Sequence, residues 1–280
     1  MTRVGPVPGQ DPEFAYVVIG EVLKSTVIEL LGPEWSWDGR RVLDFGCSSG
    51  RLLGQFLDEA RLAELHGSDI DEEAASWAQK HLCPPIADVR VNREKPPLDY
   101  PDDHFDLVTA LSVFTHIADG WSDWMLEIRR VLKPEGLLIA TFLDSIGPTL
   151  TSLPWDEERA GMSAFGFANP ETTLPNVLHS RWWLREHWGR AFEIVELRPG
   201  EEGLSHGWAV LRAREVDLTP EQLEREDPND PRYFEAHRYQ FELLRAEGEE
   251  LKQRHEELVQ SASWRLTAPV RRAKARLSRR

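Results

Sequence analysis

Cysteine is scarce in this sequence, and long apolar runs are missing. Among 280 residues the only cysteines are Cys47 and Cys83, so we expect neither a disulfide framework nor a cysteine-based zinc site. No run approaches the roughly 20 apolar residues that span a bilayer. The N-terminus lacks the basic flank and apolar core of a signal peptide. We therefore expect a soluble, cytoplasmic protein.

Negative charge dominates, but it is unevenly spread. The net charge is −15, while residues 258–280 hold seven Arg or Lys and no acid, which leaves −22 on the preceding residues. An acidic body repels phosphates, so we expect no nucleic-acid substrate. The length predicts one domain with a core of roughly 200–250 residues, plus an appendage.

The stretch from Val42 to Leu53, VLDFGCSSGRLL, has the pattern of a buried strand, a tight turn and the start of a helix. Glycine allows positive φ and close approach of a ligand, and the N–H groups of a helix start attract anions. Gly46 and Gly50 do not have the G-x-G-x-x-G spacing of dinucleotide folds. GCSSG also matches the nucleophile elbow with Ser48 as nucleophile, but barely forty residues precede it and their pattern is helical. A βα turn without a ligand is a further alternative.

Polar residues end the next two predicted strands. The second strand, 65–71, contains Asp69 about twenty residues beyond the turn, where a carboxylate can accept hydrogen bonds from ribose hydroxyls. Asp71 suits a helix N-cap. The third strand, 87–91, leaves Asn92 at its end, where the amide fits an adenine edge or an ordinary turn.

Two further apolar strands are expected at 105–111 and 137–142. Between them we expect a helix that carries Trp121, Trp124, Met125, Ile128 and Val131. The Asp-x-Gly-x-x-x-Gly string at 44–50, PPLDYPDDHFDLVTALSVFTHI and WMLEIRRVLKPEGLLIATF together resemble class I S-adenosylmethionine (SAM) dependent methyltransferases, of the type associated with bacterial surface-polysaccharide biosynthesis. The resemblance covers roughly residues 40–145 and continues more weakly to 214.

This resemblance implies an α/β fold with a Rossmann-like sheet of seven strands, the last one antiparallel, and SAM as the cofactor. It also implies O-methylation of a sugar hydroxyl on a glycan, glycolipid or nucleotide sugar. The alternatives are a methyltransferase for another small metabolite, or a non-catalytic scaffold that retains the fold and tethers glycan enzymes at the membrane.

The implied cofactor site combines the glycine turn with the strand ends. By resemblance, Asp44 and the turn hold the methionine end, Asp69 the ribose and Asn92 the adenine, while residues 112–114 line the sulfonium. The expected cofactor-binding residues are Asp44, Gly46, Cys47, Ser48, Gly50, Asp69, Ile70, Asn92, Ser112, Val113 and Phe114. Ser48 stands where the family usually has glycine, so we expect weakened or altered cofactor contact. No metal cluster is evident, and we expect no metal.

An alcohol acceptor must lose its proton during methyl transfer, and histidine is the natural base near neutral pH. The candidates are His179, His116 and His206, ranked with His179 slightly above His116. Each follows a strand or lies beside the Pro-, Gly- and aromatic-rich segment 144–180, which we expect to be an acceptor lid. For each histidine the alternative is a hydrogen-bonded or solvent-facing ring.

The expected methyltransferase domain spans residues 41–214, after an N-terminal helical cap at 1–40. Within the cap, residues 11–31 predict an amphipathic helix whose apolar positions are Phe14, Val17, Val18, Val22, Val27 and Leu30. Phe192–Leu197 and Trp208–Ala213 are expected to be the last two strands, an antiparallel pair.

The C-terminal part divides into an acidic linker at 215–230, a helix at 231–263 and a basic amphipathic tail at 264–280. The helix has two seven-residue columns, which predict either a short homo-oligomeric coiled coil or a helix folded back on the body. The columns are Phe234, Phe241, Gly248, His255 and His237, Leu244, Leu251, Leu258.

The tail could lie on an anionic bilayer, placing the protein peripherally at the inner face of the cytoplasmic membrane. Its Ser-x-Ser-Trp-Arg-Leu-Thr-Ala-Pro string resembles the C-terminal ends of glycosyltransferases and methyltransferases of surface-polysaccharide assembly. Binding of the tail to the acidic body, or to nucleic acid, are the alternatives.

Overall fold

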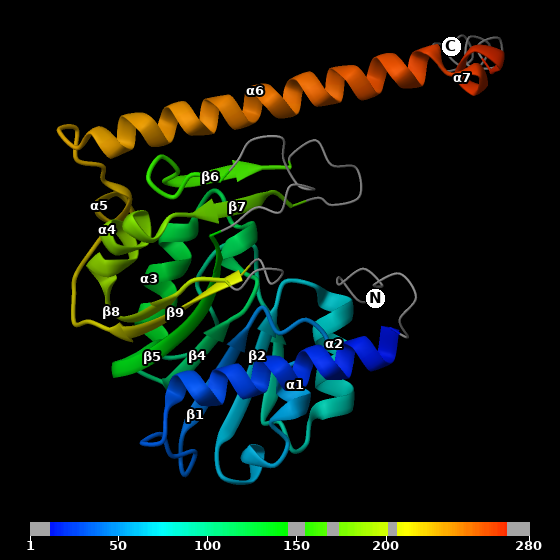
Figure 1. The fold of residues 1–280 in the computed structure, drawn as a ribbon. Helices are drawn as coiled ribbons and strands as arrows, with labels where there is room; N and C mark the ends of the chain where they lie inside the picture. Colours follow the sequence, from blue (N-terminus) through cyan, green and yellow to red (C-terminus); the bar gives the residue numbers. More distant parts are fainter. Residues whose placement is uncertain (1–11, 145–154, 167–173, 201–205, 268–280) are drawn as a thin grey trace, which may run out of the picture.

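A nine-stranded sheet forms the centre of the protein, with helices on both of its faces (Figure 1). The computed structural model describes residues 12–144, 155–166, 174–200 and 206–267. The strands are β1 (Arg41–Phe45), β2 (Glu64–Asp69), β3 (Asp88–Val91), β4 (Phe105–Ala110), β5 (Leu132–Leu143), β6 (Met162–Phe165), β7 (Asn176–His179), β8 (Phe192–Arg198) and β9 (His206–Ala213). The α-helices are α1 (Pro12–Leu31), α2 (Glu72–Leu82), α3 (Trp121–Val131), α4 (Arg181–Ala191), α5 (Pro220–Glu224), α6 (Pro231–Gln260) and α7 (Ala262–Leu266). Short 3-10 helices are η1 (Leu53–Gln55), η2 (Glu59–Arg61) and η3 (Phe114–His116).

Five strands are parallel neighbours in the order β3-β2-β1-β4-β5. Strand β9 lies antiparallel beside β5, and β8 lies antiparallel beside β9. The predicted Rossmann-like sheet with a closing antiparallel pair is therefore confirmed. The order of the strands reverses between β1 and β4, and ligands bind at the carboxyl ends of strands at such a point.

Each face of the sheet has its own apolar core. On one face α3 and α4 pack through buried tryptophans such as Trp124 and Trp188. On the other face α1 and α2 contribute Val27, Ala75 and Ala78. The helix predicted between the fourth and fifth strands is α3, and all five of its expected apolar side chains are buried.

No α-helix follows the glycine turn, contrary to the prediction for residues from Arg51 onward. The chain instead forms the 3-10 helices η1 and η2 before β2. Gly50, at φ 79°, directly precedes this stretch, and Gly54 lies within η1. Glycine in a helix interior costs about 1 kcal/mol relative to alanine, which explains the short turns.

Segment 144–180 holds a hairpin that the sequence did not indicate. Strands β6 and β7 pair antiparallel, and β7 joins the end of β5 through Leu143 and Leu178. Each strand has only four residues, too few to show a period-two pattern. Residues 145–154 and 167–173 of the predicted lid lie outside the described part of the chain.

Helix α1 forms as predicted, but its expected apolar face is only partly buried. Val27 is fully buried, whereas Phe14, Val17, Val18 and Val22 are exposed. Near its middle the helix rests on η1 and η2, because Lys24 Nζ donates to Gln55 O at 2.8 Å and pairs with Glu59. The exposed valines all precede Lys24 in the helix.

Residues 215–230, predicted to be a linker, contain the short helix α5. Its Leu223 is fully buried in the core beside α3 and α4, and its carbonyl oxygen lies 2.9 Å from His187 Nδ1. Helix α6 then starts at Pro231, as predicted, with the Asp230 carboxylate accepting a hydrogen bond from Arg232 N. Figure 1 shows α6 running past the β6–β7 hairpin and beyond the body.

Candidate active site

The glycine turn after β1 is held against the end of β2. The N–H groups of Gly46 and Cys47 donate to Ser68 O at 2.7 and 3.1 Å. Gly46 has φ 80°, and a Cβ at this position would lie 2.3 Å from Val113 Cγ2. Only glycine fits there, so the turn closes tightly on the segment that follows β4.

Ser48 adopts a left-handed conformation, with φ 51°. A residue with a Cβ takes this conformation at a cost of about 1 kcal/mol, which glycine avoids. The N–H of Ser48 donates to Asp69 Oδ2 at 2.7 Å. The turn is thus tied directly to the acid predicted to bind ribose.

Two buried carboxylates adjoin this turn. Burial raises the pKa of Asp44 to about 7, a rise that the hydrogen bond from Thr109 opposes and the charge of Asp69 increases. Asp69 accepts from Ser48 N through Oδ2 and, through Oδ1, from Asp71 N at 2.8 Å. Asp71 caps α2, as predicted, by accepting from Ala74 N. The acids expected at the two strand ends therefore lie close to the turn, and both are at least 94% buried.

The remaining predicted residues on this side differ in accessibility. Asn92 lies beside β2, where its Oδ1 accepts from Ser68 Oγ at 2.8 Å and its Nδ2 donates to Arg93 O. Both ends of the amide are therefore engaged locally. Ile70 is 51% exposed at the end of β2, while Cys47 is buried and its thiol pKa is raised by burial.

The segment after β4 was predicted to line the sulfonium. Ser112 has φ 60°, and its N–H donates to Thr141 Oγ1 on β5 at 2.7 Å. Val113 packs against Gly46. The Phe114 ring is fully buried against Trp188, with ring centroids 5.2 Å apart, so it belongs to the core.

Two of the three candidate bases meet at this end of the sheet. His206 Nε2 lies 3.4 Å from Ser112 Oγ, and His206 pairs in register with Leu143, the last residue of β5. His116 Nδ1 lies 2.9 Å from Pro175 O. Because a carbonyl only accepts, Nδ1 of His116 carries the proton and Nε2 of the neutral ring is free to act as a base. Burial, and secondly the charge of His116, lower the pKa of His206.

His179 lies apart from this group. Its ring is 1% exposed and packs against Trp183 and Trp188, with centroids 5.5 and 5.6 Å away. Burial lowers its pKa to about 3, and Nδ1 has no hydrogen-bond partner within the described structure. An acceptor cannot reach a ring in this position. The structure therefore places His179 in the core, and His116 and His206 at the strand ends.

Comparison with known proteins gives a consistent result for the central part of the chain. Residues 43–140 match the methyltransferase domain family. The ubiquinone/menaquinone biosynthesis C-methyltransferase UbiE of Ectopseudomonas mendocina is 30% identical over 142 residues, which are 48% of this chain and 52% of that protein. The 27-O-demethylrifamycin SV methyltransferase of Amycolatopsis mediterranei is 33% identical over 125 residues, covering 43% of this chain and 44% of the relative.

The central region is a class I SAM-dependent methyltransferase domain. A SAM-dependent methyltransferase structure from Mesorhizobium loti shares its fold, with a TM-score of 0.53 at 15% identity over 67% of this chain and 96% of that one. The cofactor of the methyltransferase domain is SAM. The chain spans about half the length of the curated relatives it matches.

The site of the methyltransferase domain fits this cofactor. SAM carries a cationic amino group, a carboxylate, a sulfonium and a ribose with two hydroxyls. The buried Asp44 and Asp69 suit the amino group and the ribose. Arg51, directly after the turn, has a half-buried guanidinium whose Nε is without a hydrogen-bond partner in the described structure. Burial lowers the pKa of Arg51. Such an arginine suits the cofactor carboxylate.

Several residues of the methyltransferase domain were not singled out from the sequence. Thr109 and Thr141 make the hydrogen bonds to Asp44 and Ser112 described above. Asp144, at the end of β5, accepts from Gly200 N at 2.9 Å, while its Oδ1 is buried without a partner in the described structure. Each lies at the carboxyl end of a strand, which is a signal that could have identified it.

Over the described residues, no group of three or more His, Cys, Asp or Glu side chains is placed to hold a metal ion. In the same part of the chain, no helix is long and apolar enough to cross a membrane.

Proposed function

We propose that this protein transfers the methyl group of SAM to a sugar hydroxyl of a glycan, glycolipid or nucleotide sugar. The observation that carries the O-methylation proposal is the position of two histidines at the strand ends: His206 Nε2 lies beside Ser112 Oγ, and His116 Nδ1 lies beside Pro175 O. An electron-rich carbon acceptor can attack the methyl group before it loses a proton. A neutral alcohol must lose its hydroxyl proton as it attacks, so it needs a base.

The bound cofactor supplies an electrophilic methyl group on its sulfonium. The residues of the chain hold the two reactants in line and manage one proton. Nε2 of His116 would take the proton of the acceptor hydroxyl as that oxygen becomes the nucleophile. Pro175 O holds His116 in the tautomer that leaves Nε2 free. His206 and Ser112 supply hydrogen-bonding groups to position the acceptor.

The acceptor class is proposed from the C-terminal sequence. The curated relatives are named for a quinone, a tRNA uridine and a rifamycin, so the domain hosts varied acceptors. The C-terminal SASWRLTAP string supports the surface-glycan assignment. The test incubates the protein with methyl-labelled SAM and nucleotide sugars, glycolipids and unrelated small alcohols. Label in a sugar oxygen supports the proposal, while label only in another metabolite favours the alternative small-molecule methyltransferase.

We place the protein at the cytoplasmic face of the membrane through residues 264–280. This segment combines Trp264 and Leu266 with seven cations from Arg265 onward, each contributing about 1 kcal/mol near an anionic bilayer. Leu266 is 80% exposed, and residues 268–280 lie outside the described part of the chain. Vesicles containing phosphatidylglycerol should retain the full chain and release a variant lacking 264–280; equal retention of both would contradict this.

A scaffold without turnover is the second candidate function. The strained Ser48 in the glycine turn favours it. Failure of the wild-type protein to bind SAM, together with retention of glycan enzymes on the immobilised full chain, would support the scaffold over the enzyme.

A further inference from the structure

Helix α6 has two unlike halves. Its first half packs on the β6–β7 hairpin through buried Tyr239 and Leu243. Gln240 fixes the edge of β6, because its Oε1 accepts from Ala164 N at 2.6 Å and its Nε2 donates to Ala164 O at 2.8 Å. Residues 248–260 are exposed throughout.

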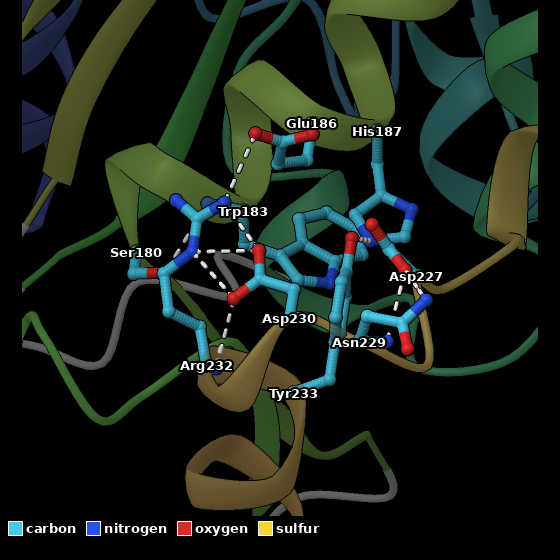
Figure 2. A network of polar contacts seen from close by, with 9 residues as sticks. All are labelled: Ser180, Trp183, Glu186, His187, Asp227, Asn229, Asp230, Arg232 and Tyr233. Carbon is cyan, nitrogen blue, oxygen red and sulfur yellow. Dashed lines mark hydrogen bonds and ion pairs between the residues drawn. The ribbon is translucent and has the colours of Figure 1, made fainter.

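The start of α6 is anchored to the body. Figure 2 shows Arg232 lying between Asp230 and Glu186 of α4, with ion-pair distances of 2.5 and 3.2 Å. Beside them, the Tyr233 hydroxyl lies 3.2 Å from His187 Nε2. The direction of the helix is therefore set by the body, while the side chains of residues 248–260 are exposed in the described part of the chain.

Alternating steps of three and four residues along α6 give positions 234, 237, 241, 244, 248, 251, 255 and 258, which form one stripe along the helix. We call these heptad positions the seam. The exposed apolar members are Phe234 (70% exposed), Phe241 (66%), Leu244 (44%), Leu251 (48%) and Leu258 (48%). The positions packed on the hairpin, Tyr239, Gln240 and Leu243, fall outside the seam. The seam is therefore a second apolar face, distinct from the docked one.

An unsupported helical segment of this kind is marginal in water. Isolated helices shorter than about 12–15 residues are barely stable even with favourable composition. The segment is helped by ion pairs four residues apart, Arg245–Glu249 at 3.1 Å and Glu250–Arg254 at 2.5 Å, but exposed pairs of this kind contribute little stability. Burial of the seam leucines would supply the missing stabilisation.

The charges beside the seam select its partner. One flank carries Arg238, Arg245 and Lys252, so two antiparallel copies would place cations opposite cations. In two parallel copies this flank faces the other one, which holds Gln240, Glu247 and Arg254. Gln240 is held by β6 and takes no part in this contact. Beyond it, Glu247, whose Oε2 also accepts from Gly166 N at 3.2 Å, faces Lys252, and Arg254 faces Val259, with no like-charge pair. The parallel arrangement is the favoured one.

We infer that the seam binds a second copy of this chain, with the two α6 helices parallel. His237, Gly248 and His255 also lie in the seam and reduce its apolar area, and His237 Nε2 lies 2.9 Å from Glu226 Oε2. We therefore expect a reversible, concentration-dependent assembly. Because α6 also holds the β6–β7 hairpin, self-association would set the spacing between two predicted acceptor lids.

The test compares the full chain with two double variants by sedimentation equilibrium over a range of concentrations. Leu251→Lys with Leu258→Lys charges the seam, whereas Gln253→Lys with Gln260→Lys adds the same charge to the same stretch outside it. We expect a mass above the monomer for wild type and the control, and monomer for the seam variant, with circular dichroism confirming that the body stays folded. A monomeric wild type, or a seam variant that still associates, would overturn the inference.

Orientation is tested by crosslinking. With Cys83→Ser in the background, Leu258→Cys should form a disulfide-linked dimer under mild oxidation, because equivalent positions meet only in parallel helices. A crosslink absent for Leu258→Cys in a protein shown to associate would overturn the parallel arrangement.

Discussion

The hydroxyl of Thr109 on β4 donates a hydrogen bond to the carboxylate of Asp44 on β1, with 2.8 Å between Oγ1 and Oδ1. The two residues are paired in register on neighbouring parallel strands. Among the described residues, the groups that act on this carboxylate are Thr109 and Asp69, neither of them a cation. A buried carboxylate without a cation is poised for a positively charged ligand group.

Replacement of Asp44 by Asn should stabilise the ligand-free protein at alkaline pH. The pKa of Asp44 is raised from 3.8 to about 7, so folding opposes its ionisation and the free energy of unfolding falls as pH rises from about 4 to 7. The variant loses this penalty, gaining at most about 4 kcal/mol at pH 8. Urea denaturation of wild type and variant at pH 5 and pH 8 measures this gain in the free energy of unfolding. A wild-type-to-variant difference that is the same at both pH values would contradict the assignment.

Replacement of His116 by Gln should lower the rate of methyl transfer about 10²–10⁴-fold, because the acceptor proton loses its base. SAM affinity should stay unchanged, since the ring lies beside the acceptor position. His206→Gln should show a smaller loss through acceptor KM. The matched control is His179→Phe, whose buried ring takes no part. Full activity in His116→Gln, or loss of activity in a folded His179→Phe, would contradict the proposed role of His116 as the base.

His179 should make the protein acid-labile. Burial lowers its pKa from 6.5 to about 3, so the unfolded chain takes up the proton first and stability is lost as pH falls from about 6.5 toward 3. At pH 4 the penalty is at most about 3 kcal/mol. His179→Phe should therefore shift the acid-unfolding midpoint, followed by tryptophan fluorescence, to lower pH. An unchanged midpoint would show that the ring is accessible to solvent.

Relief of the left-handed strain at Ser48 should stabilise the turn. Ser48→Gly removes the Cβ at φ 51°, and the expected gain is about 1 kcal/mol in the free energy of unfolding. Affinity for SAM should rise if strain in the turn opposes cofactor contact. Ser49→Gly is the neighbouring control and should destabilise, because it removes the 3.1 Å contact between Ser49 Oγ and Tyr16 Oη. Equal changes in the free energy of unfolding for Ser48→Gly and Ser49→Gly would contradict the presence of strain at Ser48.

Much of the fold could be predicted because the central strands β1, β4 and β5 contain buried apolar runs that are bounded by turn residues. Asp44, Gly46 and Asp69 were predicted at strand ends, and the structure gathers them around one turn. The β6–β7 hairpin was not predictable, because four-residue strands carry no visible period. Helix α5 was missed for a similar reason, since one buried Leu223 secures it.

The histidines show where sequence reasoning ends. His179 and His116 both follow short apolar stretches beside the lid, and nothing in their neighbours separates them. The difference lies in tertiary packing, because α4 brings Trp183 and Trp188 over His179 while His116 lies at the strand ends near Pro175.

The most direct test of the account is calorimetric titration of the full chain with SAM and with S-adenosylhomocysteine, alongside Asp69→Ala. Each charge-assisted hydrogen bond to the ribose is worth about 1.5–3 kcal/mol, so Asp69→Ala should weaken binding about tenfold or more. Thermal melting of the variant controls for the loss of its bonds to Ser48 N and Asp71 N. We expect both ligands to bind the wild type. A folded wild-type protein that binds neither would contradict the proposed enzyme.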